Sequence, residues 1–165
     1  MNNMRRGFTM IELIFVIVII GILAAVAIPK LAANRDDAEA STCVHEVGQL
    51  IQEMSASYTK LGHADYVTAT IGSITNISTG QTVGTIGTKG IVQAGTTVLA
   101  TTVAITYKCD DTVVATLTGT DAGVDFNLTA VTPAIAGLSP AATKAVTDIS
   151  KNLGVAINAV KTFTL

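Results

Sequence analysis

Glu12 is the only charged residue in a stretch of 21 residues, Phe8 to Ile28, that is otherwise almost entirely apolar. A carboxylate inside a lipid bilayer costs about 2.5 to 3.5 kcal/mol on insertion scales unless a partner lies nearby. A cationic group beside Glu12 would offset that cost. The alternative is that Glu12 extends its carboxylate to the lipid headgroups, because it lies close to one end of the stretch.

The stretch around Glu12 has the length of a membrane-spanning helix. As an α-helix it would extend about 31 Å, the thickness of a hydrocarbon core. Arg5 and Arg6 precede it, so the positive-inside tendency predicts a cytoplasmic N-terminus and places the chain after Lys30 outside. A conventional signal peptide cleaved near AAVAIPK, or a plain single-pass anchor, would also explain an apolar stretch, but neither explains Glu12.

The sequence RRG followed by FTMIELIFVIVIIGILAAVAIPKLA, within residues 5–34, resembles the class III signal and N-terminal helix of type IV pilins and type II secretion pseudopilins. The resemblance implies that a prepilin peptidase cuts between Gly7 and Phe8 and methylates the new amino terminus of Phe8. Residues 1–7 would then be a cleaved leader. Glycine suits a scissile bond, because the missing Cβ lets a catalytic carboxylate approach the backbone.

The resemblance also gives Glu12 a partner and residues 8–28 a role as transmembrane and assembly helix. The α-amine of the processed Phe8 would neutralise Glu12, within one helix or between an incoming subunit and one already in a filament. Gly21 and Pro29 both weaken helical structure, and the resemblance implies that this part of the helix can unwind inside an assembled filament.

The function implied is that of a structural subunit, processed and polymerised into the helical filament of a type IV pilus or a type II secretion pseudopilus. Expected partners are further copies of the chain, the prepilin peptidase, an inner-membrane platform protein, an assembly ATPase and minor pilins. The expected location is the inner membrane, followed by a periplasmic or cell-surface filament. The alternative is a minor tip pilin that acts as an adhesin or in DNA uptake.

Composition argues against other functions. The net charge is -2, charged residues make up 13% of the chain, and no cluster of lysine or arginine follows Arg6, so nucleic-acid binding is not expected. No nucleophile, metal or phosphate motif predicts an enzyme. His45 and His63 are the only histidines, and both are predicted to be solvated surface residues.

The fold predicted is α+β, with a long N-terminal helix packed on an antiparallel sheet, as in pilins. Residues 29–60 should continue the helix amphipathically to about Thr59, with Gly62 ending it. The apolar stripe on this helix comprises Cys43, Val47, Leu50, Ile51, Met54 and Tyr58.

Residues 61–165 should form a globular head. Alternating apolar residues predict antiparallel strands over residues 101–109, 112–119 and 124–131, and the composition of residues 66–107 favours loops and strands. Ser139 and Pro140 mark the start of a helix over residues 140–152, which Gly154 would stop. The final KTFTL is predicted to be the last strand.

Three further groups of residues could carry chemistry in the head. Cys43 and Cys109 predict either a disulfide, in an oxidising compartment, or two buried thiols. Major pseudopilins often hold calcium in a C-terminal loop, for which Asp110, Asp111, Asp121 and Asp125 are candidates, although aspartates are common in turns and no metal motif is present. Asn76 and Asn127 begin N-x-S/T glycosylation triplets, and Asp125 lies two positions before Asn127, as bacterial oligosaccharide transfer prefers.

Overall fold

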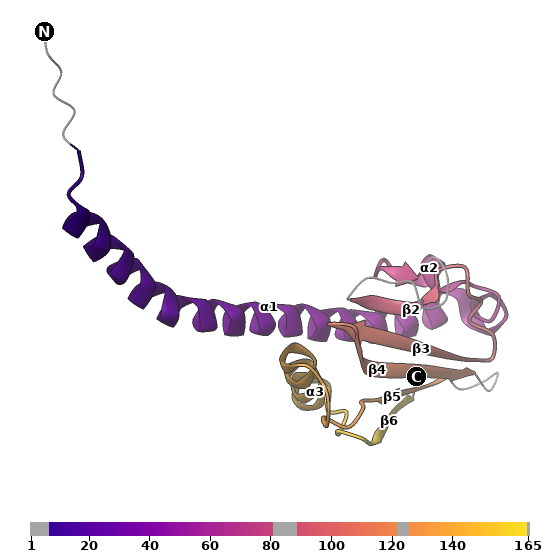
Figure 1. The fold of residues 1–165 in the computed structure, drawn as a ribbon. Helices are drawn as coiled ribbons and strands as arrows, with labels where there is room; N and C mark the ends of the chain where they lie inside the picture. Colours follow the sequence, from indigo (N-terminus) through magenta and orange to yellow (C-terminus); the bar gives the residue numbers. More distant parts are fainter. Residues whose placement is uncertain (1–6, 81–88, 122–125, 165) are drawn as a thin grey trace, which may run out of the picture. The chain divides into compact units, whose positions relative to one another are not determined.

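A computed structural model of the protein describes residues 7–80, 89–121 and 126–164. Its elements, in chain order, begin with the long helix α1 (Met10–Tyr66) and the short helix α2 (Ile71–Ile74), and continue with six strands and the helix α3 (Pro140–Leu153) (Figure 1). Contacts divide the chain into two compact units, here called the N-terminal unit (Met1–Asp36) and the C-terminal unit (Asp37–Leu165). The predicted α+β class is confirmed.

The N-terminal unit is helical from Met10 onward and keeps its apolar side chains outside any core. Phe8 is 84% exposed, Ile11 is 76% exposed and Val26 is 70% exposed. The helix α1 contains a window long and apolar enough to cross a membrane, with a mean hydropathy of 3.1 and no buried residue. A surface of this kind is unfavourable in water, at roughly 1.5 to 3 kcal/mol for each large side chain left exposed.

The part of α1 in the C-terminal unit buries the predicted stripe. Ala40, Cys43, Val47, Leu50 and Met54 are at most 1% exposed, and Ile51 and Tyr58 pack against this core with partial burial. Spacings of three and four residues put these side chains on one face of the helix, which explains why the periodicity in the sequence was informative.

The long helix is broken at Gly62, as predicted, because the backbone there is non-helical with φ 72° and ψ 173°. A further short helical segment, which was not predicted, follows the kink and extends α1 to Tyr66. That positive φ is strained for any residue with a Cβ, so glycine is required there. The continuation is stabilised because Tyr66 is buried, with its ring centroid 5.3 Å from that of Tyr58 and 5.2 Å from that of Phe126.

The six strands form one sheet in the order β1-β2-β3-β4-β5-β6. Their bounds are β1 Thr79–Gly80, β2 Gly90–Ala94, β3 Thr102–Cys109, β4 Thr112–Asp121, β5 Phe126–Val131 and β6 Val160–Thr164. All neighbouring pairs are antiparallel except β1 and β2, which are parallel. The predicted antiparallel sheet is therefore confirmed for the strands from β2 onward.

The predicted strand boundaries are close to those of β3, β4 and β5. Asp110 and Asp111 form a two-residue hairpin turn with φ of 49° and 57°, the backbone geometry that aspartate tolerates in such turns. The strand β4 runs two residues past its predicted end at Gly119, because Asp121 still pairs with Phe126. The predicted start of β5 at residue 124 lies outside the described residues.

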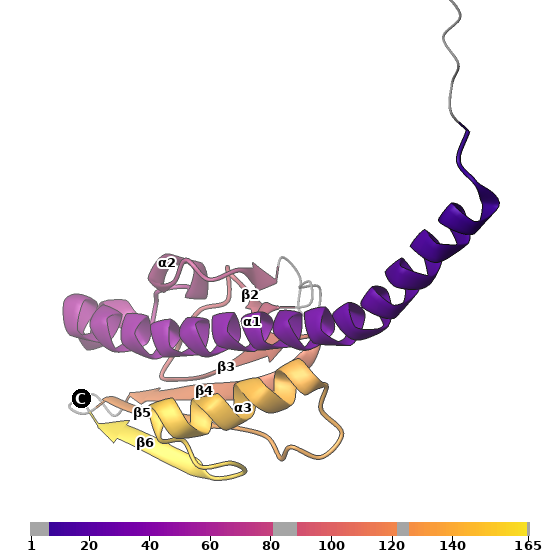
Figure 2. The same cartoon turned by 90° about the vertical axis from the view of Figure 1, so that its left-hand side faces the viewer.

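Both long helices pack on the same face of the sheet, and Figure 2 shows α3 beside α1 with the strands behind them. The inward side chains Ile105, Leu117, Phe126 and Leu128 are fully buried together with residues of both helices. The alternate positions on the other face of β4 and β5 are Thr116, Thr118, Thr120, Asn127, Thr129 and Val131, and none is charged. This outward face is half-buried to exposed.

The helix α3 begins and ends close to the predicted residues. The Ala142 backbone N–H donates to Ser139 Oγ at 3.2 Å, which satisfies one of the unpaired donors of the first turn, and Pro140 lies in that turn. Gly154 ends the helix with φ of 65°. The sequence did not predict α2, because four residues are too few to show a helical period.

Candidate functional site

The peptide bond between Gly7 and Phe8 lies just before α1, in a segment without regular structure. Phe8 is exposed, and a Cβ placed on Gly7 would meet nothing within 4 Å. A peptidase needs such an unpaired, accessible backbone around its scissile bond. Arg5 and Arg6, which precede the bond in the sequence, lie outside the described residues.

Glu12 lies in the first turn of α1, where its carboxylate reaches back to Thr9. The Thr9 backbone N–H donates to Glu12 Oε2 at 3.4 Å, and the Thr9 hydroxyl donates to the same oxygen at 3.3 Å. Threonine just before the helix and glutamate three residues later have the spacing of a capping box, and the Thr9 N–H bond to Glu12 is one of its two hydrogen bonds. A carboxylate at this place also benefits from the positive end of the helix dipole. Thr9 was missed in the sequence analysis, and its T-x-x-E spacing was the signal that could have identified it.

Open apolar grooves surround Glu12. Phe8, Leu13 and Val16 line one groove with the carboxylate, and Ile11 and Phe15 contribute to the neighbouring one. In a medium without water, these grooves would leave Glu12 with Thr9 as its only described partner in the chain. A cation supplied nearby would therefore gain a strong, poorly screened interaction.

Gly21 and Pro29 both lie within continuous helical structure here. Nothing lies within 4 Å of a Cβ placed on Gly21, so glycine is not required at this position by packing inside the chain. Unwinding of this part of α1 on assembly stays a prediction.

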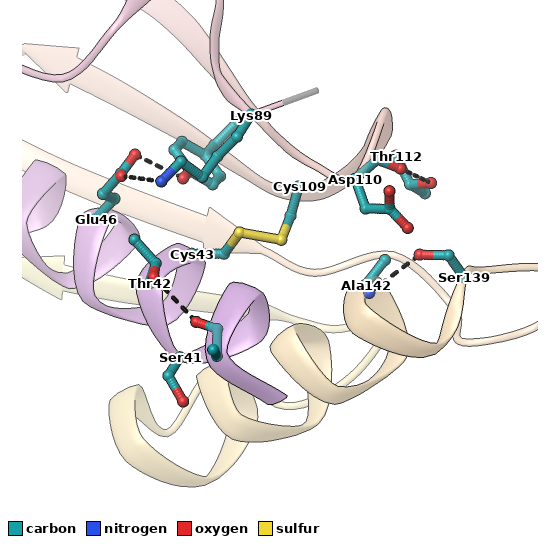
Figure 3. The surroundings of a disulfide bond; sticks show 12 residues. Ser41, Thr42, Cys43, Glu46, Lys89, Cys109, Asp110, Thr112, Ser139 and Ala142 are labelled. Carbon is teal, nitrogen blue, oxygen red and sulfur yellow. Dashed lines mark hydrogen bonds and ion pairs between the residues drawn. A yellow bond between two sulfur atoms is a disulfide. The ribbon is translucent and has the colours of Figure 1, made fainter. Parts of the chain in front are cut away.

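Cys43 and Cys109 form the predicted disulfide, which joins α1 to the last residue of β3 (Figure 3). Both cysteines are fully buried. Beside them, the Tyr107 hydroxyl donates to Glu46 Oε2 at 2.7 Å, and Lys89 Nζ lies 2.8 Å from Glu46 Oε1. Burial and the adjacent Glu46 carboxylate raise the pKa of Tyr107 well above its ordinary value. The bond and this polar cluster together attach β2 and β3 to the helix.

The aspartates considered for calcium do not form one group in the part of the chain that the structure describes. Asp110 and Asp111 form the turn just before β4 and Asp121 ends that strand, so about 30 Å of extended strand separates them. Asp125 lies outside the described residues. No group of three or more His, Cys, Asp or Glu side chains that could hold a metal was found among the residues described.

The two histidines differ in their surroundings. His45 is exposed, as predicted. The His63 side chain is 46% exposed, but its Nδ1 lies 2.5 Å from Asp121 Oδ2, and the Asp121 side chain is only 1% exposed. The Tyr58 hydroxyl also donates to Asp121, at 3.3 Å. Burial, followed by the charge of Asp121, raises the pKa of Tyr66 well above the ordinary tyrosine value.

Comparison with known proteins adds a motif and several relatives. Residues 2–28 match the family described as the prokaryotic N-terminal methylation motif. The chain is 39% identical to type II secretion system core protein G of Klebsiella michiganensis over 64 residues, which are 39% of this chain and 44% of that protein. It is 37% identical to core protein G of Escherichia coli strain K12 over 71 residues, which are 43% of this chain and 48% of that protein.

A second kind of relative is the type IV major fimbrial protein FimA of Dichelobacter nodosus, which is 44% identical over 50 residues, 30% of this chain and 32% of that protein. The chain thus spans less than half the length of each of these relatives. No solved structure matches it. Residues 2–28 are therefore a prokaryotic N-terminal methylation motif, and the resemblance to type IV pilins and type II secretion pseudopilins is confirmed.

Proposed function

We propose that the chain is a structural subunit of a helical filament, anchored in the inner membrane before assembly and held in the filament through residues 8–28. The observation that carries this proposal is an apolar helix that is left uncovered and contains one carboxylate, inside a matched methylation motif. Copies of this helix would cover one another's apolar surface. The chain is a building component and not an enzyme.

Processing supplies the cation that Glu12 lacks. Cleavage between Gly7 and Phe8 by a prepilin peptidase creates an α-amine four residues before Glu12. This amine lies at the N-terminal end of α1, where Thr9 already donates two hydrogen bonds to the Glu12 carboxylate. Hydrolysis adds one water across the peptide bond, giving the Gly7 carboxylate and the Phe8 amine. In the filament, Glu12 of one subunit and the Phe8 amine of another form an ion pair. Their attraction offsets the cost of taking both charges out of water.

The relatives include both a secretion core protein and a major fimbrial protein, so a pseudopilus and a pilus are equally supported. A cytoplasmic ATPase acting through a membrane platform protein would drive either assembly. Electron microscopy of sheared surface material, from cells with and without this gene, separates the cases. Loss of the filaments means a main pilin, whereas unchanged filaments mean a pseudopilin or a minor tip subunit.

The decisive test of the pairing mechanism is Glu12→Gln, with Glu12→Ala beside it. Either change removes the only charge in the span, so the monomer should accumulate in the membrane while filaments fail to form. The Phe8 amine would enter the filament without a counter-charge, at a cost of several kcal/mol for each subunit. Asp36→Asn is the matched control, because it removes a carboxylate from the same helix outside the apolar stretch. Normal filaments from Glu12→Gln would contradict the proposal, and loss of the monomer would instead indicate a folding defect.

A further inference from the structure

Asn127 begins the triplet Asn127-Leu128-Thr129 on β5, and its surroundings bear on when it could be modified. Asn127 and Thr129 are two positions apart on one strand, so both side chains point to the same face of the sheet. That face is the outward one, opposite the helices, and both residues are half-buried in it. An oligosaccharide attached to Asn127 would therefore extend away from the core, and the folded unit can carry it.

The same position is closed to an enzyme once the unit has folded. Asn127 pairs with Thr120 of β4 on one side and with Thr164 of β6 on the other. The Thr129 hydroxyl, which an acceptor triplet must present to the transferase, donates to the Thr118 carbonyl at 3.1 Å. Because the transferase has to accommodate the peptide backbone around the asparagine, β5 would have to leave both neighbours first.

The chain order keeps the triplet open for a limited time. The strand that closes the second side of β5 is β6, Val160–Thr164, at the C-terminal end of the sheet order. During export from the N-terminus, β5 emerges before β6, so Asn127 stays unpaired on that side until residues 160–164 follow.

The second triplet, Asn76-Ile77-Ser78, has the opposite properties. Asn76 and Ser78 are exposed and lie in a loop between α2 and β1. The residue two positions before Asn76 is the apolar Ile74, whereas Asp125 holds that position before Asn127. Asn76 is thus accessible but lacks the acidic residue, and Asn127 has it but is accessible only before folding.

We propose that Asn127 is an N-glycosylation site that is modified during export, before β6 pairs with β5. The co-substrates are a bacterial oligosaccharyltransferase and an oligosaccharide linked to a polyprenyl pyrophosphate. The Asn127 amide nitrogen forms a bond to C1 of the first sugar, the bond from C1 to the pyrophosphate oxygen breaks, and the amide loses one proton as the polyprenyl pyrophosphate leaves. The site is independent of whether the chain forms filaments.

The site is tested by producing the full chain in bacteria together with such a transferase and its lipid-linked donor, followed by intact-mass measurement and peptide mapping. The expected product carries one glycan, on the Asn127 peptide. Asn127→Gln and Thr129→Val should lose it, and the matched changes Asn76→Gln and Thr129→Ser should keep it. An unmodified Asn127 in the accumulated protein, or a glycan on Asn76 instead, would overturn the assignment.

The timing is tested with purified, unmodified full chain in detergent, given the same transferase and donor. A synthetic peptide spanning residues 121–133 serves as the unpaired acceptor. The folded chain should be modified at least about tenfold more slowly than the peptide, because β5 must open first. Equal rates would show that the folded sheet does not protect Asn127, and would refute modification before folding.

Discussion

The N-terminal and C-terminal units use similar apolar residues in opposite ways. Ile11 and Val26 in the N-terminal unit are 76% and 70% exposed, whereas Leu50 and Met54, further along the same helix, are fully buried against the sheet. The C-terminal unit buries its apolar side chains in a core of its own, and this burial stabilises its fold. The N-terminal unit leaves its side chains to be covered by something else, so changes there should affect processing and assembly while changes in the C-terminal unit affect folding.

Gly7→Asp should have the largest effect, and only on the N-terminal unit. The change adds a charged side chain at the bond that we propose is cleaved, so we expect uncleaved precursor that is seven residues longer than the product and still in the membrane, because the apolar stretch is intact. Intact mass of the membrane fraction measures this.

The matched control is Gly21→Ala, where an added Cβ meets nothing within 4 Å and helix propensity improves by about 1 kcal/mol. This variant should be processed normally. Recovery of native protein that begins at residue 29 or later would mean that the segment is a conventional signal peptide, and would contradict our assignment of the leader.

Removing the disulfide should have the largest effect on the C-terminal unit. Cys43 and Cys109 are 66 positions apart, and the chain-entropy relation gives about 4 kcal/mol for closing a loop of that size. The double change to Ala should lower the free energy of unfolding by about that amount, measured by urea denaturation, with processing at Gly7 unchanged. Two reactive thiols in denatured, unreduced wild-type protein would show that the bond is absent in the cell.

The sequence predicted those parts of the fold whose periodicity is local. The buried stripe on α1, the hairpin at Asp110 and Asp111, and the capped helix α3 all follow from patterns a few residues long. Residues 66–107 were harder, because their structure depends on distant partners. Lys89 pairs with Glu46 on α1, and β2 is positioned by its pairing with β3, which no local pattern specifies.

The candidate site was predictable to the same degree. Glu12 was identified because a charge in an apolar stretch is conspicuous, but its partner Thr9 was overlooked although the spacing of a capping box was present. The contact between His63 and Asp121 joins residues 58 positions apart, and it depends on the helix continuing past Gly62. Only the folded unit brings these two side chains together.

Tyr107→Phe tests the polar cluster beside the disulfide, with a smaller effect. Loss of the hydrogen bond to Glu46 should cost about 1.5 to 3 kcal/mol at neutral pH, since the acceptor is charged. The raised pKa means that the folded state favours the protonated hydroxyl, so this contribution is full below the ordinary tyrosine value of about 10 and is lost as the pH rises beyond it.

Wild type should therefore lose stability more steeply above pH 10 than Tyr107→Phe does, as followed by urea denaturation at several pH values. Parallel pH profiles would mean that the hydroxyl contributes nothing to the alkaline sensitivity.

Ser139→Ala should have the smallest effect, because it removes one cap from one helix of the C-terminal unit. Ser139 Oγ accepts from the Ala142 N–H at 3.2 Å, and replacing an N-cap serine by alanine typically costs about 1 kcal/mol.

Ser139→Asp is the matched control: it restores an acceptor and places a negative charge at the positive end of the helix dipole, so its stability should equal or exceed that of wild type. Urea denaturation measures both variants. Equal losses from both would show that the site responds to packing and not to capping. Filament formation should be unaffected by either change, because both lie outside residues 8–28, which we propose hold the filament together; loss of filaments from Ser139→Ala alone would contradict the separate roles assigned to the two units.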